Sequence, residues 1–159
     1  MIRLHLTVIA FALAGASAFA QSDGPGNGAW NIEIGGIGQL VSVNKEWVLA
    51  QKSSGFWLAR VGVAKYSDYG FGIPHSITWN MGKHKSFLEL GLGGSLGPTT
   101  FGYADASAEL YYFAPIAGYR LHPSKGFQFR IFTSPFLTLG GEVELNGVVG
   151  VSFGLVFRR

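Results

Sequence analysis

The sequence contains no cysteine, and few of its residues are charged. The absence of cysteine excludes disulfide bonds, thiolate metal sites and the lipid attachment of a bacterial lipoprotein. Only 13% of the 159 residues are charged, and no run of Lys or Arg suggests a nucleic-acid groove. Beyond the N-terminal segment, no apolar stretch reaches the length of a membrane-spanning helix without glycine or charge, which argues against a helical membrane protein.

The N-terminal segment has the layout of a signal peptide. Arg3 supplies a positive charge, Leu4–Ala14 form a mostly apolar run, and the small residues Ala18 and Ala20 stand where a signal peptidase reads. A transmembrane anchor is the alternative, but a spanning helix needs about 20 apolar residues and this run is shorter. We therefore predict a cleaved signal peptide over residues 1–20, cut before Gln21, and a mature domain over residues 21–159.

Apolar residues, aromatic residues and glycine are abundant. Hydrophobic residues make up 48% of the chain and aromatic residues 14%, and there are 24 glycines. This composition indicates that something other than water solvates much of the surface. A closed β-barrel crosses a bilayer without leaving backbone groups unpaired in lipid, so the composition favours a transmembrane β-barrel.

Strand-like segments of about ten residues with period-two alternation follow one another along the mature chain, bounded by turn residues. In the last one the larger side chains occupy alternate positions: Val149, Val151, Phe153, Leu155 and Phe157. The other segments lie at 40–49, 56–66, 71–81, 88–93, 108–121 and 127–132. Pro115 and an irregular pattern suggest a bulge in the segment 108–121.

The connections predict the topology. Short basic turns at 50–55, 82–85 and 122–126 are typical of the periplasmic side, and 67–70, 97–107 and 139–146 are expected outside the cell. Working backward from a periplasmic C-terminus requires an ascending first strand over Trp30–Ile34, which gives an eight-stranded antiparallel up-and-down barrel. The alternative is that Trp30–Leu49 form one long strand. A soluble β-sandwich would also show alternating strands, but strand length and sparse charge favour the barrel.

Strand parity directs a set of polar side chains into the barrel: Asn44, Glu46, Arg60, Thr78, Asn80, Glu89 and Arg130. An eight-stranded barrel is just wide enough for side chains to fill it, so we expect a paired Arg–Glu network that plugs the lumen. A narrow ion- or proton-conducting path along the same charges is the alternative. Four tryptophans near strand ends are expected to form aromatic girdles at the membrane interfaces: Trp30, Trp47, Trp57 and Trp79.

The C-terminal pattern, with apolar residues at every second position before an aromatic one, resembles the signal by which the outer-membrane assembly machinery recognises barrel clients. It consists of Val151, Phe153, Leu155 and Phe157, although Arg158 and Arg159 follow the phenylalanine. Together with the turn 82–85 leading into 87–93, and with Gly118-Tyr119-Arg120, the chain resembles uncharacterised small outer-membrane β-barrel proteins of Bacteroidota. The resemblance implies a Gram-negative outer membrane and brings no catalytic residues.

The positions of the histidines indicate whether the barrel could be an enzyme. Some small outer-membrane barrels transfer or remove acyl chains of lipid A, and they need a Ser with a His base near the outer rim. His84 and His122 fall in basic turns, where we expect solvated side chains. His75 lies nearer the outside, but Ser76 points to the opposite face and the His-x-Ser-Asn pattern of the deacylase family is missing.

We therefore expect a monomeric structural or interaction barrel, integral to the outer membrane. Its expected partners are outer-membrane lipid and the assembly machinery, and it needs neither a cofactor nor a metal and carries no catalytic residues. A narrow channel is the first alternative, and a lipid-modifying enzyme is the second.

Overall fold

The computed structural model describes residues 25–38, 40–66, 70–97, 111–135, 137–138 and 149–158. Within these ranges it contains nine strands and one turn of 3-10 helix. The predicted signal peptide lies outside these residues. The elements are β1 (Gly28–Gly35), η1 (Gly36–Gly38), β2 (Val41–Lys52), β3 (Gly55–Tyr66), β4 (Gly70–Lys83), β5 (Ser86–Leu96), β6 (Tyr111–Leu121), β7 (Gly126–Thr133), β8 (Leu137–Thr138) and β9 (Val149–Phe157).

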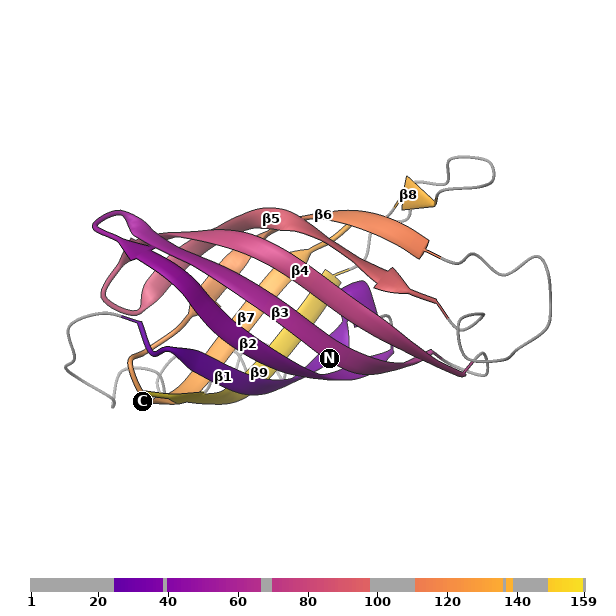
Figure 1. The fold of residues 1–159 in the computed structure, drawn as a ribbon, viewed down its shortest axis with the longest axis horizontal. Helices are drawn as coiled ribbons and strands as arrows, with labels where there is room; N and C mark the ends of the chain where they lie inside the picture. Colours follow the sequence, from indigo (N-terminus) through magenta and orange to yellow (C-terminus); the bar gives the residue numbers. More distant parts are fainter. Residues whose placement is uncertain are drawn as a thin grey trace, which may run out of the picture.

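The strands form one antiparallel sheet that closes on itself (Figure 1). Its order is β5-β4-β3-β2-β1-β9-β7-β6-β8, and β5 also pairs with β6. Because β7 and β8 both pair with β6, they are two parts of one interrupted strand, and the barrel has eight strands. The predicted fold class is confirmed, and a sandwich of two open sheets is excluded.

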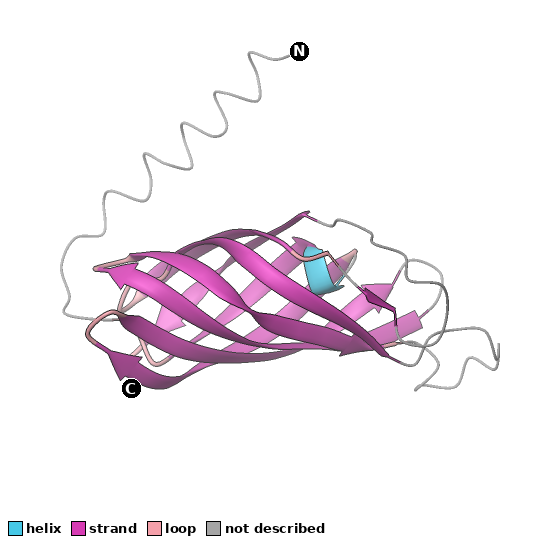
Figure 2. Cartoon of the chain, turned by 90° about the horizontal axis from the view of Figure 1, so that it is seen from above, coloured by secondary structure: helices cyan, strands magenta, loops and turns pink. Residues whose placement is uncertain are grey.

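The first strand is separate from the second. Trp30 in β1 pairs with Lys45 in β2, and the chain turns through η1 between them. Ile37 in this turn is buried, and Figure 2 shows the short helix at the end of the barrel. One long strand over Trp30–Leu49 is therefore excluded.

The prediction of a bulge in the segment that contains Pro115 is wrong. Pro115 stands in regular register with Leu92 of β5. The register instead shifts between Val48 and Ala50, where β2 pairs with β3. The irregularity near Pro115 lies on its other side, where the pairing of β6 passes from β7 to β8; a proline has no N–H to donate to a neighbouring strand.

Candidate functional site

Successive residues of each strand point alternately to the inner and the outer face of the barrel wall. Odd-numbered residues of β4 point outward and even-numbered ones inward, as the burial pattern of that strand shows. In the described strands most inward side chains are buried, and the inner face combines polar and charged side chains with two apolar clusters, whereas many large apolar side chains on the other face are exposed. The structure therefore provides two candidate sites, a polar lumen and an apolar outer wall.

The lumen holds three glutamates and three arginines in contact with one another. Glu33 pairs with both Arg60 and Arg130, and Glu89 pairs with both Arg130 and Arg120. Arg120 also pairs with Glu46, with 2.7 Å between Nη1 and Oε2. All six side chains are essentially inaccessible to solvent. Buried charges persist only when they are paired, and this network pairs each of them.

The structure buries every residue that the sequence analysis placed in the lumen: Asn44, Glu46, Arg60, Thr78, Asn80, Glu89 and Arg130. The amide nitrogen of Asn44 donates to Asn31 and Ser42, and that of Asn80 donates to the Thr78 hydroxyl. These hydrogen bonds are separate from the ion-paired group.

Three members of the network were missed, namely Glu33, Arg120 and Gln128. Gln128 donates to Glu46 over 3.1 Å. Strand parity would have placed Glu33 inside, because it alternates with outward Trp30, Ile32 and Ile34. Arg120 was lost because the segment containing Pro115 was read as irregular.

Apolar clusters pack inside the barrel toward both of its ends. Phe56, Leu58 and Phe87 form a buried cluster at the end that carries the β2–β3 and β4–β5 turns. At the other end Ile37 packs in a second cluster with Ala64, Ala114, Ile116 and Phe132. The ion-paired charges lie between these two clusters, and the buried polar side chains of Gln128 and His122 continue from Glu46 toward the turn end.

His122 corrects an expectation. We expected a solvated turn residue, but its side chain is fully buried beside Phe56, with ring centroids 5.2 Å apart. Its ring nitrogens contact the Gln128 side-chain oxygen and the Gly26 carbonyl oxygen at 3.0 and 3.2 Å. Burial lowers the pKa of His122, and the charge of Arg120 lowers it further. His84, by contrast, is exposed.

The outer wall carries the four tryptophans and the C-terminal apolar series. Trp57 and Trp79 are in register on β3 and β4, with ring centroids 5.2 Å apart. Trp30 and Trp47 are also exposed on this wall. The last strand presents Val151, Phe153, Leu155 and Phe157 to the outside; Phe153 and Leu155 are exposed, and Val151 and Phe157 are half-buried. Their role in assembly stays a prediction.

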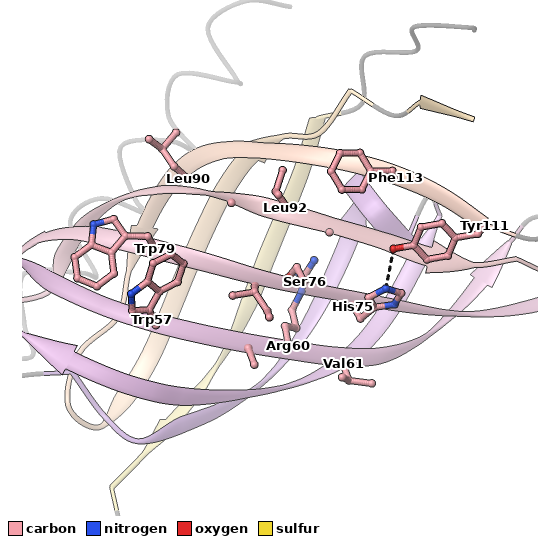
Figure 3. Close-up of a pocket in the computed structure, with 14 residues that line it drawn as sticks. Trp57, Arg60, Val61, His75, Ser76, Trp79, Leu90, Leu92, Tyr111 and Phe113 are labelled. Atoms are coloured by element: carbon pink, nitrogen blue, oxygen red, sulfur yellow. Dashed lines mark hydrogen bonds between the residues drawn. The ribbon is translucent and has the colours of Figure 1, made fainter. Parts of the chain in front are cut away.

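A groove of about 860 Å³ runs along the outer wall over β3, β4, β5 and β6. We call it the outer groove; its side walls include Trp57, Val61, His75, Ile77, Trp79, Leu90, Leu92, Tyr111 and Phe113. Trp57 and Trp79 lie at one end, and His75 and Tyr111 lie at the other (Figure 3).

His75 and Tyr111 form a polar pair within this apolar groove. Nε2 of His75 lies 3.1 Å from the Tyr111 hydroxyl oxygen, and Nδ1 lies 3.1 Å from the Ile73 carbonyl oxygen. A carbonyl can only accept, so Nδ1 carries the proton in this bond. In the neutral ring Nε2 is then the acceptor, and the tyrosine hydroxyl donates to it.

The local sequence explains how the pair meets. Gly94 is in register with His75 on one side and with Phe113 on the other. It continues the outward series of Leu90 and Leu92 but has no side chain, so the rings of β4 and β6 can meet over β5.

Pro74 weakens the wall beside the pair. Pairing of β3 with β4 lapses between Val61–His75 and Ala64–Gly72, opposite Gly62, although the register is the same on both sides. A proline cannot donate the hydrogen bond that this position requires.

No group of three or more His, Asp or Glu in the described ranges is arranged to hold a metal ion. No helix among these residues is long and apolar enough to cross a membrane.

The closed eight-stranded barrel, with its ion-paired interior and apolar wall, has the architecture of small outer-membrane barrels. The chain is similar to a solved structure described as the crystal structure of the outer membrane enzyme PagL. The two share 14% sequence identity with a TM-score of 0.52, and the match covers 83% of this chain and 99% of the PagL chain. No protein-family model and no curated protein sequence matches the chain.

These comparisons correct one expectation and leave another open. The expectation of a barrel without catalysis is overturned, because a solved structure with this fold is that of an outer membrane enzyme. The resemblance to Bacteroidota barrel proteins is not confirmed. At this identity the likeness shows the fold, so any activity must be argued from the residues of this chain.

Proposed function

We propose that this protein is an outer-membrane enzyme that cleaves an ester-linked acyl chain from a membrane lipid. The observation that carries the proposal is the His75–Tyr111 pair in the outer groove. Polar groups that face lipid are costly and commonly mark function. This pair also has the arrangement of an activated nucleophile, because Tyr111 contacts a base whose other nitrogen is held by the Ile73 carbonyl.

The outer groove suits an acyl chain. Its side walls between the tryptophans and His75 are formed by Val61, Ile77, Leu90 and Leu92. A volume of about 860 Å³ lies within the range of small-molecule sites. Because the groove opens on the outer wall, a lipid could enter it sideways from the bilayer without crossing the lumen.

The reaction would proceed in two steps. The Tyr111 hydroxyl oxygen attacks the ester carbonyl carbon while Nε2 of His75 takes the phenol proton; the bond to the lipid alcohol breaks, and this proton passes to the leaving oxygen. Water then attacks the acyl-tyrosine, giving its proton to His75. The free fatty acid leaves, and His75 returns the proton to the tyrosine oxygen.

The membrane placement belongs to the same proposal. The short turns and the C-terminus are at one end of the barrel (Figure 1), and in outer-membrane barrels short turns face the periplasm. His75 lies in the opposite half, toward the outer leaflet. We propose that residues 1–20 direct export and that the apolar series ending at Phe157 directs assembly.

Lipid mass spectrometry tests the activity. Cells that express the protein should contain lipid A or phospholipid lighter by one acyl chain, together with the free fatty acid. His75→Gln should lower the rate at least about a hundredfold because it removes the proton acceptor, and Tyr111→Phe should lower it at least as much because it removes the nucleophilic oxygen. Tyr119→Phe is the matched control, since it removes a phenol hydroxyl that donates to the Ser86 hydroxyl near the turns.

Each variant must first migrate on an unheated gel as a folded barrel. Lipids that are identical with and without the gene would overturn the proposed activity. Equal activity of Tyr111→Phe and the wild type would overturn the assignment of the nucleophile.

A further inference from the structure

A second cavity, independent of the outer groove, lies at the turn end of the barrel. It measures about 300 Å³ and sits between the β2–β3 turn and the β4–β5 turn. The two turns are joined directly, because the Gly82 amide donates to the Ser54 carbonyl over 3.1 Å. A side chain at Gly82 would collide with the backbone of Ser86, so glycine permits the close approach of the strands here.

The rim of this cavity is basic. Lys52, Lys83 and His84 line it, and Gln51 and Ser53 add polar groups. Across the described ranges every carboxylate side chain belongs to Glu33, Glu46 or Glu89, which are buried in the lumen. No described acidic side chain therefore neutralises the rim.

The floor of the cavity is apolar. Phe56 and Phe87 line it and pack edge to face, with ring centroids 4.8 Å apart. Both belong to the buried apolar cluster at the turn end of the barrel. The cavity is thus a cup whose cationic rim lies above an aromatic floor.

The backbone at the rim is strained. His84 has a φ of 61°, and it is the only described residue other than glycine with a positive φ. A two-residue hairpin turn that needs this conformation usually has glycine there. Strained residues cluster at ligand sites, and here the strained residue presents an imidazole to the cavity.

We infer that this cup binds a phosphate group carried on a short apolar stem. Lysine is a point charge suited to phosphate, and a mixed lysine and histidine rim supplies donors from several directions. The aromatic floor would cover the stem. The same chemistry is presented by the headgroup of an anionic phospholipid in the adjoining leaflet and by a soluble phosphate ester. The nearby Trp57–Trp79 pair favours the lipid, because aromatic girdles stand at headgroup depth.

Calorimetric titration of the mature protein in a zwitterionic detergent tests the inference. The probes are dihexanoyl phosphatidic acid, dihexanoyl phosphatidylcholine and inorganic phosphate. The proteins are the wild type, the double variant Lys52→Gln/Lys83→Gln and the control Lys65→Gln. Lys65 lies on β3 at the opposite end, so the control removes a lysine charge far from the cup.

Phosphatidic acid should bind the wild type and the control saturably, and its Kd should rise at least about tenfold in the double variant, which loses two charge-assisted contacts. Phosphatidylcholine should bind more weakly, since its headgroup has no net charge. Binding of inorganic phosphate as tight as that of phosphatidic acid would support the phosphate site and assign it to a soluble ligand. Absence of saturable binding, or equal binding by all three proteins, would overturn the inference.

Discussion

At the scale of single residues, Arg120 is the arginine of the described network whose loss would leave a glutamate without an ion-pair partner. It contacts both Glu46 and Glu89, and Glu89 in turn reaches Arg130 and through it Glu33. Removing Arg120 leaves Glu46 with the Gln128 amide as its remaining described partner. The network is therefore most sensitive at this arginine.

We expect Arg120→Met to lower the free energy of unfolding by about 3–5 kcal/mol, because it leaves a buried carboxylate without its cation. Urea titration of the barrel refolded in lipid vesicles measures this change. Adding Glu46→Gln should recover part of the loss by removing the stranded charge. Exposed Lys125→Gln should change stability by less than about 0.5 kcal/mol. If Arg120→Met were as stable as this control, the network would not contribute to stability.

His122 gives the barrel a pH dependence outside the membrane-spanning strands. Burial first, and the charge of Arg120 second, lower the pKa of His122 from its usual 6.5. The unfolded chain therefore takes up a proton at a higher pH than the folded barrel does. The stabilisation is complete above the unfolded pKa and is lost as the pH falls below it.

The midpoint of heat unfolding in detergent should accordingly fall by a few degrees between about pH 8 and about pH 5. In His122→Gln the unfolding midpoint should fall less over this pH range than in the wild type, because the contribution of His122 is removed. His84→Gln, which alters an exposed histidine, should keep the wild-type profile. Identical pH profiles for the wild type and His122→Gln would contradict the role of His122.

At the scale of elements, alternation along single strands was enough to predict most of the barrel. The segments 56–66, 71–81 and 149–157 are within β3, β4 and β9, and the separate first strand was required by counting strands back from the C-terminus. The shift between Val48 and Ala50 was not predictable, because it depends on how β2 meets β3 and not on either strand alone.

The outer groove could not be predicted from single strands either. His75 and Tyr111 are 36 residues apart in the chain and lie on strands that do not pair with each other. They meet because β5 lies between them and offers a glycine at the contact. Sequence reasoning compared His75 with its chain neighbour Ser76, which points into the barrel, and so missed the partner on β6.

At the scale of the whole molecule, the exposed apolar wall indicates what surrounds the barrel. Ile32 on β1 is 54% exposed and in register with Val43 and Phe153, both also exposed. Val149 is 64% exposed but lies at the beginning of β9, at the loop end. In water a charged side chain would be tolerated at either position. In a bilayer the cost of a charge depends on depth.

We therefore expect Ile32→Arg to reduce the free energy of folding into vesicles by about 2–4 kcal/mol, and Val149→Arg to reduce it by about 0–1 kcal/mol. Urea titration followed by tryptophan fluorescence measures both, since the chain has four tryptophans. The two positions are similarly exposed, so loss of packing contributes little to the difference, and depth in the bilayer is what separates them. Equal costs at Ile32 and Val149, or a stable fold of both variants without lipid or detergent, would show that water and not lipid surrounds this wall.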